Sequence, residues 1–476
     1  MKCDYDLIII GAGTAGVVAA VYGKAMYRKV LLVESGRPGG KNFFSYTYPL
    51  NAVISISRKI NTVRSMENLG VNPGAINMDF NILKRKTEDT MKLIAEGVSS
   101  EIFRKMGIDF ISGSASFKAR NVLDIDGKSI SGSKFILSTG LENIIPDIQG
   151  LDKDKCLFAE DVINLSELPE SACIIGAGES GIEISNALAG FGSRVILFER
   201  NSEILPDEDS EIRDILEKNM TEKGITIYKS AVITKIESSG NGYKVNYVSE
   251  GKETSLETDK IFCCAGRRPD FGKLNPDAAG IRHVSDKIIT DRYLRTSSEN
   301  IFAAGDITGK MNYNNTAEIE GLTAVINSAH YFKKPVNYDI IPRCINGDME
   351  FARFGLTESE AEKKYGHGIR VYKFPLKYSI KASIENMSEG MAKIICRSNS
   401  RIVGAHIYSD GASELIHQLL LLVRLKRKFS EISHIPHAFP SYSDILRQPS
   451  KRCYMEQQID NPLLNIINGL FGRKLR

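Results

Sequence analysis

Glycines at a repeated spacing carry the clearest chemistry in this sequence. They stand directly after two apolar stretches, YDLIII and SACII, as Gly11, Gly13 and Gly16 and again as Gly176, Gly178 and Gly181. In a Gly-x-Gly-x-x-Gly turn the first glycine makes the tight turn and the second lets a pyrophosphate approach the backbone. The third lets the following helix pack on the strand, and the helix N-terminus faces the anion. The chain therefore predicts two dinucleotide-binding sites.

An acidic residue closes the second strand after each glycine turn. KVLLVES contains Glu34 and SRVILFER contains Glu199, each at the same spacing from the first glycine of its turn. A carboxylate in this position can accept a hydrogen bond from a ribose hydroxyl. The economical pair of dinucleotides is a flavin that stays bound and a nicotinamide that exchanges. We expect NADH to be preferred to NADPH because Glu199 would repel a 2′-phosphate, although the adjacent Arg200 partly offsets this.

The composition is that of a globular α/β chain that can position such turns. A length of 476 residues predicts two or three domains, and the hydrophobic and charged fractions are 42% and 25%. A net charge of +4 does not suggest nucleic-acid binding. No apolar run reaches the ~18 residues of a membrane span, and LIHQLLLLVRL, interrupted by His417, Gln418 and Arg424, predicts a buried helix.

The eight cysteines show no CxxC pair and no zinc-site spacing. We expect most of them to be buried thiols, no metal site, and a reducing, cytoplasmic location.

Further motifs give the chain a family resemblance. With these motifs and the two glycine turns, the sequence resembles the flavin-dependent pyridine nucleotide-disulfide oxidoreductases. Within that family it resembles dihydrolipoamide dehydrogenases most of all. The motifs follow the family's order: STG (138–140), CAGRRPD (264–270), TSSENIFAAGDITG with Asp306, NYNNTAEIEG (312–321) and GAHIYSDGASELI (404–416).

The resemblance implies an architecture of three parts. An FAD-binding domain would comprise residues 1–150 and 271–340, with an NAD(P)-binding domain inserted at 151–270. Residues 341–476 would form a C-terminal α+β dimerisation domain, an antiparallel sheet with helices. The fold class is therefore α/β, with two Rossmann-like domains. The resemblance also implies a homodimer in which the C-terminal segment of one subunit completes the active site of its partner.

The family's nucleotide contacts can be carried over residue by residue. For FAD they are Gly11, Gly13, Ala15, Gly16, Glu34, Ser35, Gly40, Lys41, Ala115, Thr139, Gly140, Asp306, Tyr313 and Asn314. For NAD they are Gly176, Gly178, Gly181, Glu183, Glu199 and Gly266.

The stretch GGKNFFSYTYPLN (39–51) departs from the family pattern, which holds a redox-active cysteine pair here. Gly39, Gly40 and Pro49 keep the frame, but the two cysteine positions hold Asn42 and Thr47. The family has a lysine beside the flavin, and Asn51 stands at that position here. The glutamate that usually pairs with this lysine is kept as Glu183.

The C-terminal motif has changed in the same sense. In HAFPSYSD, Phe439 stands at the position of the family's histidine base and Asp444 at that of its glutamate. Phenylalanine cannot move a proton, and we expect the nearby His437 to be structural. Disulfide exchange needs a thiol pair and a base. Cys3 and Cys453 have no adjacent cysteine to replace the missing pair.

The sequence therefore predicts an FAD-dependent NAD(P)H oxidoreductase that passes electrons directly from reduced flavin to a non-disulfide acceptor, such as a quinone, a dye, oxygen or a protein. Soluble transhydrogenase-like transfer between nicotinamides and a non-catalytic FAD-binding subunit remain alternatives. Overall likeness alone would suggest a dihydrolipoamide dehydrogenase, but these residues argue against that activity. The aromatic residues Phe43, Phe44, Tyr46 and Tyr48 either line an acceptor pocket or pack in the core.

Overall fold

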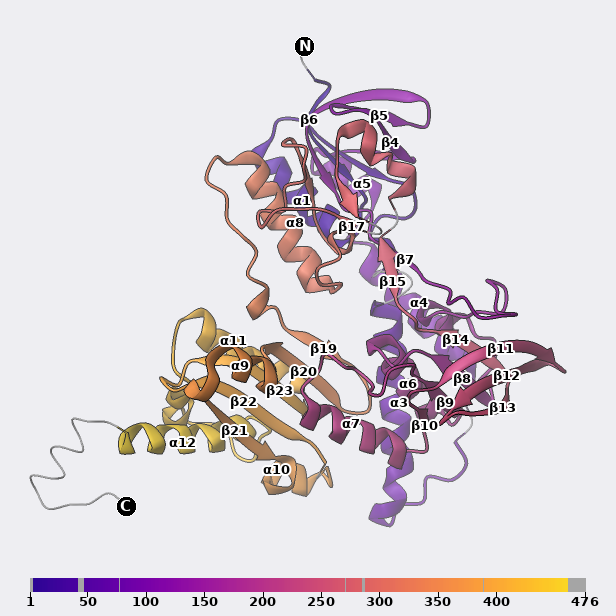
Figure 1. Cartoon of the computed structure of the whole chain (residues 1–476), viewed down its shortest axis with the longest axis vertical. Helices are drawn as coiled ribbons and strands as arrows, with labels where there is room; N and C mark the ends of the chain where they lie inside the picture. The colour runs from indigo at the N-terminus through magenta and orange to yellow at the C-terminus, as the bar shows by residue number, and fades with distance from the viewer. Residues whose placement is uncertain are drawn as a thin grey trace, which may run out of the picture. The chain divides into compact units, whose positions relative to one another are not determined.

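The computed structural model describes residues 3–41, 47–76, 78–269, 271–284, 287–387 and 389–460. The chain divides into two units, Met1–Arg200 with Ser230–Asn337 and Asn201–Lys229 with Tyr338–Arg476. Figure 1 shows the helices and strands of each unit. The predicted fold class is confirmed: two Rossmann-like parts precede a C-terminal α+β part. The predicted domain limits stay a prediction.

An apolar strand near the N-terminus organises the first sheet. β1 (Tyr5–Ile10) runs parallel to β2 (Val30–Glu34) and to β6 (Lys128–Leu137). β3 (Asp109–Ser112) extends the sheet beyond β2, and β18 (Ile301–Ala303) pairs with β6. The middle of β1 is fully buried, as is usual for a parallel strand that is covered on both faces.

Two helices cover one face of this sheet. α1 (Thr14–Met26) and α8 (Asn314–Ala329) lie side by side and share one hydrophobic core with β1 and β2. Several of their buried positions are alanines, which let the helices approach closely. The other face packs on β4 (Ala115–Ala119) and β5 (Val122–Ile125). This arrangement fixes the N-terminal ends of α1 and α8 near the carboxyl end of β1.

A second parallel sheet repeats this design. β8 (Ser171–Ile175) lies between β9 (Arg194–Phe198) and β14 (Lys260–Cys263), and α6 (Glu179–Phe191) follows β8. An antiparallel sheet stands between β9 and β14 in the sequence; it comprises β11 (Val232–Ser239), β12 (Gly242–Ser249) and β13 (Lys252–Thr258).

The second unit contains an antiparallel sheet, as expected for the C-terminal part. Its order is β19-β20-β23-β22-β21. The strands are β19 (Arg343–Ile345), β20 (Glu350–Gly355), β21 (Ile369–Pro375), β22 (Met391–Arg397) and β23 (Ile402–Ser409). Helices α11 (Ala412–Arg424) and α12 (Asp444–Ile459) pack into its core.

The prediction of a buried helix at LIHQLLLLVRL is confirmed only in part. The segment is helical, within α11, but it buries only one face. Leu415, Ile416 and Leu419 are buried, whereas Leu421 is 59% exposed. The helix is therefore amphipathic, because its polar residues fall among leucines that point outward.

Buried ion pairs hold the segment Asn201–Lys229 in the second unit. The Nζ atom of Lys393, a residue only 1% exposed, lies 2.8 Å from Asp209 Oδ1. The same atom lies 2.6 Å from Glu211 Oε2 and 2.6 Å from Glu358 Oε2. Removing one partner from such a cluster leaves an uncompensated buried charge, so the segment is firmly fixed to this sheet.

Further elements complete the described chain. In the first unit they are α3 (Thr47–Ser65), α4 (Phe80–Ala95), α5 (Ser100–Lys105), β7 (Leu141–Asn143), β15 (Arg267–Pro269), β16 (His283–Val284) and β17 (Lys287–Ile288). In the second they are α7 (Ser210–Glu222), β10 (Thr226–Tyr228), α9 (Glu358–Tyr365) and α10 (Ile380–Ile384).

The prediction that most cysteines are buried thiols was wrong, since Cys173, Cys396 and Cys453 are the only buried free thiols among the described residues. Cys156 and Cys263 form a disulfide across a sequence separation of 107 residues. They become neighbours because Leu157 bridges Phe262 in the sheet, which no local spacing reveals. The cysteine argument for a cytoplasmic location therefore loses part of its basis, and that location stays a prediction. Among the described residues, no helix combines the length and the apolar character needed to cross a membrane.

Candidate functional site

The backbone of the first glycine turn leaves no room for side chains at two of its three glycines. Gly11 has φ +100°, and a Cβ there would lie 2.3 Å from the carbonyl oxygen of Ser138. A Cβ on Gly16 would lie 1.8 Å from the carbonyl oxygen of Gly11. Gly13 faces open space, with no described atom within 4 Å of an ideal Cβ. Since α1 begins at the next residue, the unpaired N–H groups of its first turn point to this space.

Glu34 is fixed at the end of β2 by the backbone around it. The N–H of Ala12 donates to its Oε2 at 2.6 Å, and the N–H of Gly36 donates to its Oε1 at 2.7 Å. Each carboxylate oxygen keeps a further lone pair that can accept from a ligand hydroxyl. The residue is therefore oriented before any ligand binds.

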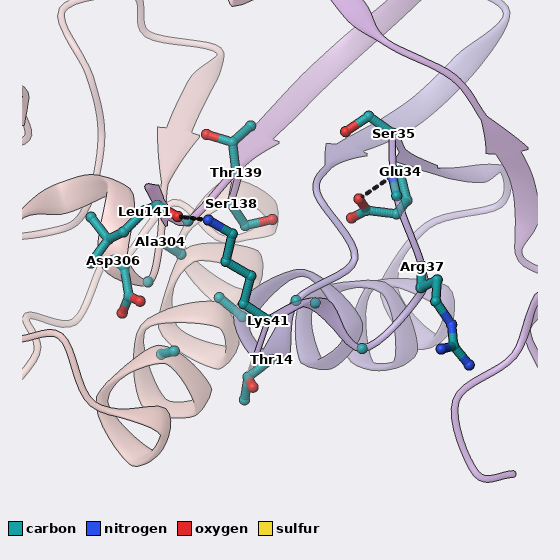
Figure 2. Close-up of a pocket in the computed structure, with 18 of the residues that line it drawn as sticks. Thr14, Glu34, Ser35, Arg37, Lys41, Ser138, Thr139, Leu141, Ala304 and Asp306 are labelled. Atoms are coloured by element: carbon teal, nitrogen blue, oxygen red, sulfur yellow. Dashed lines mark hydrogen bonds between the residues drawn. The ribbon is translucent and has the colours of Figure 1, made fainter. Parts of the chain in front are cut away.

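A cavity of about 440 Å³ opens in front of this turn. Figure 2 shows Asp306 at one end, Glu34 and Arg37 at the other, and Lys41 between them. Its lining comprises Gly13, Thr14, Ala15, Glu34, Ser35, Gly36, Arg37, Gly39, Gly40, Lys41, Ser138, Thr139, Gly140, Leu141, Arg267, Ala304, Gly305, Asp306 and Ala317. A smaller cavity of about 190 Å³ shares Glu34, Ser35 and Lys41 and adds Gly113, Ser114 and Ala115. Together they suit an extended ligand with an anionic middle.

Lys41 supplies positive charge to this cavity. Its ammonium donates to the carbonyl oxygen of Leu141 at 2.9 Å, across the space between two loops (Figure 2). An ammonium has three donors, so two remain for an anion. With Arg37 it gives the cavity the charge complementary to a pyrophosphate.

Asp306 is held on a short turn by a fully buried glutamate. The N–H of Gly305 donates to Glu320 Oε2 at 2.7 Å, and the hydroxyl of Thr308 lies 3.3 Å from the same oxygen. Burial raises the pKa of Asp306 to about 6, and Arg267 partly opposes this shift. A carboxylate withdrawn from water gains from hydroxyl donors, which the ribityl chain of a flavin would provide.

The second glycine turn repeats the first. Gly176 has φ +105°, and a Cβ on Gly181 would lie 1.9 Å from the carbonyl oxygen of Gly176. The N–H of Ala177 donates to Glu199 Oε2 at 2.9 Å, as Ala12 does to Glu34. Glu199 is only 7% exposed. This turn also leaves its second glycine, Gly178, facing open space among the described atoms.

The start of α8 links the two turns. The hydroxyl of Thr14, at the start of α1, hydrogen-bonds Asn314, and the phenol of Tyr313 hydrogen-bonds Glu179, the first residue of α6. Three helix N-termini therefore converge, and each favours an anion. A flavin on one turn and a nicotinamide on the other would meet near Tyr313.

The segment that replaces the redox cysteines is only partly described. Thr47 is the first residue of α3, and the side-chain amide of Asn51 donates to its carbonyl oxygen at 2.7 Å. Ser57 of the same helix donates to Ala187 of α6 at 3.0 Å, so α3 packs on the helix that carries the 7%-exposed Glu183. Asn42, Phe43, Phe44 and Tyr46 lie outside the described residues, so their predicted positions stay untested.

The C-terminal motif offers no imidazole at the base position. Phe439 is 71% exposed. The Nδ1 atom of His437 lies 3.3 Å from the hydroxyl of Ser443, and burial lowers the pKa of this histidine. Asp444 accepts a hydrogen bond from Gln448 within α12. His437 is thus hydrogen-bonded within its own segment, and its structural role stays a prediction.

Two models of known protein families match most of the chain. The model for pyridine nucleotide-disulphide oxidoreductases matches residues 5–324, and the model for their dimerisation domain matches residues 341–449. The chain belongs to this family. Its members are flavin-dependent oxidoreductases that bind FAD and a pyridine nucleotide, and the matching dimerisation domain supports a homodimer.

Similar proteins within the family carry the names of different enzymes. The chain is 27% identical over 423 residues to a mercuric reductase from Bacillus cereus, covering 88% of this chain and 67% of that protein. It is 28% identical over 455 residues to a dihydrolipoyl dehydrogenase from Geobacillus stearothermophilus, covering 94% and 96%. A Cu(II) complex of the HOCl-induced flavoprotein disulfide reductase RclA from Escherichia coli has the same fold. That match has a TM-score of 0.83 at 24% identity and covers 95% and 100% of the two chains.

The structure brings together many of the FAD residues expected from sequence. Those that line the two cavities are Gly11, Gly13, Ala15, Glu34, Ser35, Gly40, Lys41, Ala115, Thr139, Gly140 and Asp306. Gly16, Tyr313 and Asn314 stand beside the cavities rather than in their lining. Their ligand-binding roles stay predictions.

Sequence reasoning overlooked several residues of the site. Arg37 and Arg267 line the larger cavity, Glu320 fixes the turn of Asp306, and Glu179 contacts Tyr313. Arg267 lies within the CAGRRPD motif, so a search of that motif for cations would have found it. Glu320 lies within NYNNTAEIEG and Glu179 within the second glycine turn, but neither motif reveals the contact, because each residue acts on a partner brought near by the fold.

Proposed function

We propose that this protein is an FAD-dependent NAD(P)H oxidoreductase that passes electrons directly from reduced flavin to a non-disulfide acceptor. The proposal combines a complete dinucleotide cradle with a missing route to a disulfide. One observation carries it: Thr47, at the second cysteine position, has no sulfur, although it begins the helix that packs on α6.

The cavity residues support FAD as the first dinucleotide. Glu34 would accept from the adenosine ribose, while the α1 N-terminus and Lys41 would hold the pyrophosphate. Asp306 would accept from the ribityl chain, which would offset the cost of its burial. FAD held by these residues would supply hydride acceptance from the nicotinamide and two-electron donation to the acceptor. A quinone would leave as the quinol after taking up those electrons with the hydride's proton and one more proton from solvent.

The second turn supports a nicotinamide as the exchanging dinucleotide. Glu199 is held by a hydrogen bond from Ala177, and its carboxylate would oppose the 2′-phosphate of an adenosine ribose bound beside it. NADH is therefore the proposed donor. Glu183 lies on α6, the helix that follows the second turn. The family places a lysine beside this glutamate, but here the position of that lysine holds Asn51.

The function can be tested without knowing the physiological acceptor. NADH added without air to the purified yellow protein should bleach the flavin, and a quinone or a dye should restore the colour. Dihydrolipoamide should give no turnover above background, and no thiolate-to-flavin absorbance band should appear on reduction. A protein that NADH does not bleach would be a binding subunit rather than an enzyme. A screen that includes a second nicotinamide would reveal transhydrogenase activity.

A glycine variant provides the structural control. In Gly176→Ala the new Cβ would lie 2.5 Å from the carbonyl oxygen of Cys264, which should close the second turn and slow bleaching while FAD stays bound. Gly368→Ala adds a Cβ with no described neighbour within 4 Å and should behave as the unmodified protein. Equal bleaching in both variants would contradict the assignment of the second turn to the nicotinamide.

A further inference from the structure

Two aromatic side chains after α8 stand almost fully in solvent. Tyr331 is 91% exposed and Phe332 is 87% exposed, and their rings meet edge to face with centroids 5.5 Å apart. In the part of the chain that the structure describes, no other large hydrophobic side chain is as exposed. Adjacent exposed aromatic rings are characteristic of a surface that contacts a partner.

The turn that carries them, residues 330–334, is rigidly fixed to α8. The fully buried side chain of Asn327 accepts from the N–H of Lys334 at 2.9 Å and donates to the carbonyl oxygen of Lys334 at 2.8 Å. Lys333 donates to the carbonyl oxygen of Asn327 at 2.9 Å, and its ammonium lies 5.1 Å from the ring centroid of Phe302. The hydrogen bonds that join Asn327 to Lys333 and Lys334 fix the turn. The exposure of the two aromatic side chains therefore does not result from a loose loop.

The surroundings of this turn are basic. His330 and Lys334 are exposed on either side of the aromatic pair. Burial lowers the pKa of Lys333, and Arg295 and Lys134 add to this effect, against a single opposing carboxylate, Asp291. Cations therefore outnumber carboxylates among the groups that act on Lys333, where Asp291 also pairs with Arg295 at 3.2 Å.

The end of α1 adds to the same surface. The phenol of Tyr27 lies 2.9 Å from the hydroxyl of Ser328, which places the last turns of α1 and α8 side by side. The residues next to Tyr27 are exposed, and they are the apolar Met26 and the basic Arg28 and Lys29. One carboxylate also lies here, because the N–H of Lys29 donates to Asp6 Oδ2 at 3.0 Å. The end of α1 thus adds one apolar and two basic exposed residues beside a single acid.

We propose that the turn 330–334, with the adjoining end of α1, docks on an anionic lipid surface. Aromatic rings settle at the boundary between headgroups and acyl chains, while lysine and arginine side chains reach the phosphates. The charge of the turn favours an anionic over a neutral surface. The contact is peripheral, and it is independent of the proposed reaction.

Vesicle sedimentation of the purified holoprotein tests this. One set of vesicles contains phosphatidylglycerol mixed with phosphatidylcholine, and the other contains phosphatidylcholine alone. The protein should sediment with the anionic vesicles only, and added salt should release it. Lys334→Glu should weaken binding roughly five-fold for each unit of charge changed. Tyr331→Ser combined with Phe332→Ser should reduce sedimentation to the level seen with neutral vesicles, while the flavin stays bound.

Tyr378→Ser is the matched control. Tyr378 is another exposed aromatic residue, 65% exposed, with the ammonium of Lys377 5.3 Å from its ring centroid. Binding should survive this change. The proposal fails if the unmodified protein ignores anionic vesicles or if the double variant still binds them. It also fails if analytical ultracentrifugation shows that the double variant loses its oligomeric state, because the surface would then belong to a second copy of the chain.

Discussion

The carboxyl group of Asp306 should make FAD binding depend on pH. The residue begins the short helical turn Asp306–Thr308 and lines the larger cavity. Withdrawal from water raises its pKa from 3.8 to about 6, although Arg267 favours the ionised form. The ionised form is the one that accepts hydrogen bonds from a ribityl chain, so protonation should weaken FAD binding.

The size of the effect follows from the shift. About two pKa units correspond to ~3 kcal/mol, an upper value because the side chain is only partly shielded from solvent. Since the pKa is raised in the folded state, this group favours folding below pH 3.8, and that contribution is lost as the pH rises to about 6. The affinity for FAD should depend on pH in the opposite direction. Its hydroxyls stabilise the carboxylate, so FAD should bind tightly above pH 6 and weaken up to about ten-fold per pH unit below it.

Flavin release from the holoprotein measures this directly. Free FAD, separated by ultrafiltration and quantified by fluorescence, gives the dissociation constant between pH 8 and pH 5. Asp306→Asn should bind FAD more weakly at pH 7 and should lose the pH dependence. Asp277→Asn, which changes a carboxylate whose side chain is 83% exposed, should keep it. A flat profile in the unmodified protein, or the same slope in Asp306→Asn, would refute the reasoning.

Three further predictions concern other residues. Glu199→Ala should lower the ratio of flavin-reduction rates with NADH and NADPH by about ten-fold in stopped-flow measurements; an unchanged ratio would remove this residue from nicotinamide selection. Glu320→Ala leaves the N–H of Gly305 without its buried acceptor, so the free energy of unfolding in urea should fall by about 1–3 kcal/mol, with loss of FAD. Equal stability would show that another group holds that turn. Asn42→Cys combined with Thr47→Cys should not create lipoamide turnover, because the missing base alone costs about 10²–10⁴-fold; measurable turnover would disprove the need for that base.

The two dinucleotide turns could be predicted because their constraints are local. A Cβ on Gly16 or Gly181 would collide with a backbone oxygen of its own turn, so the glycine spacing itself encodes the geometry. Glu34 and Glu199 follow from the same local rule, since Glu34 ends β2, Glu199 directly follows β9, and each accepts a hydrogen bond from the glycine turn of its own sheet. The antiparallel C-terminal sheet was likewise expected, from the resemblance to the family.

Contacts between distant segments could not be predicted. Glu320 holds a glycine 15 residues away through the packing of α8, and Cys156 meets Cys263 across 107 residues. The burial of α11 was also overestimated, because composition reveals apolar content but not which side meets the sheet. These features depend on tertiary packing, which carries no local signature in a single sequence.

The proposed loss of disulfide chemistry is physically compatible with an intact nucleotide cradle. The cradle depends on positions where a side chain would collide with the backbone, as at Gly11 and Gly176. The disulfide route depends instead on the chemistry of particular side chains: Asn51 bonds to Thr47 within its own helix turn, and Phe439 is 71% exposed in the single chain. A thiol or a base can be lost at such positions without any change at the glycines of the turns. The fold can therefore keep both dinucleotide turns while the electrons leave the flavin by another route.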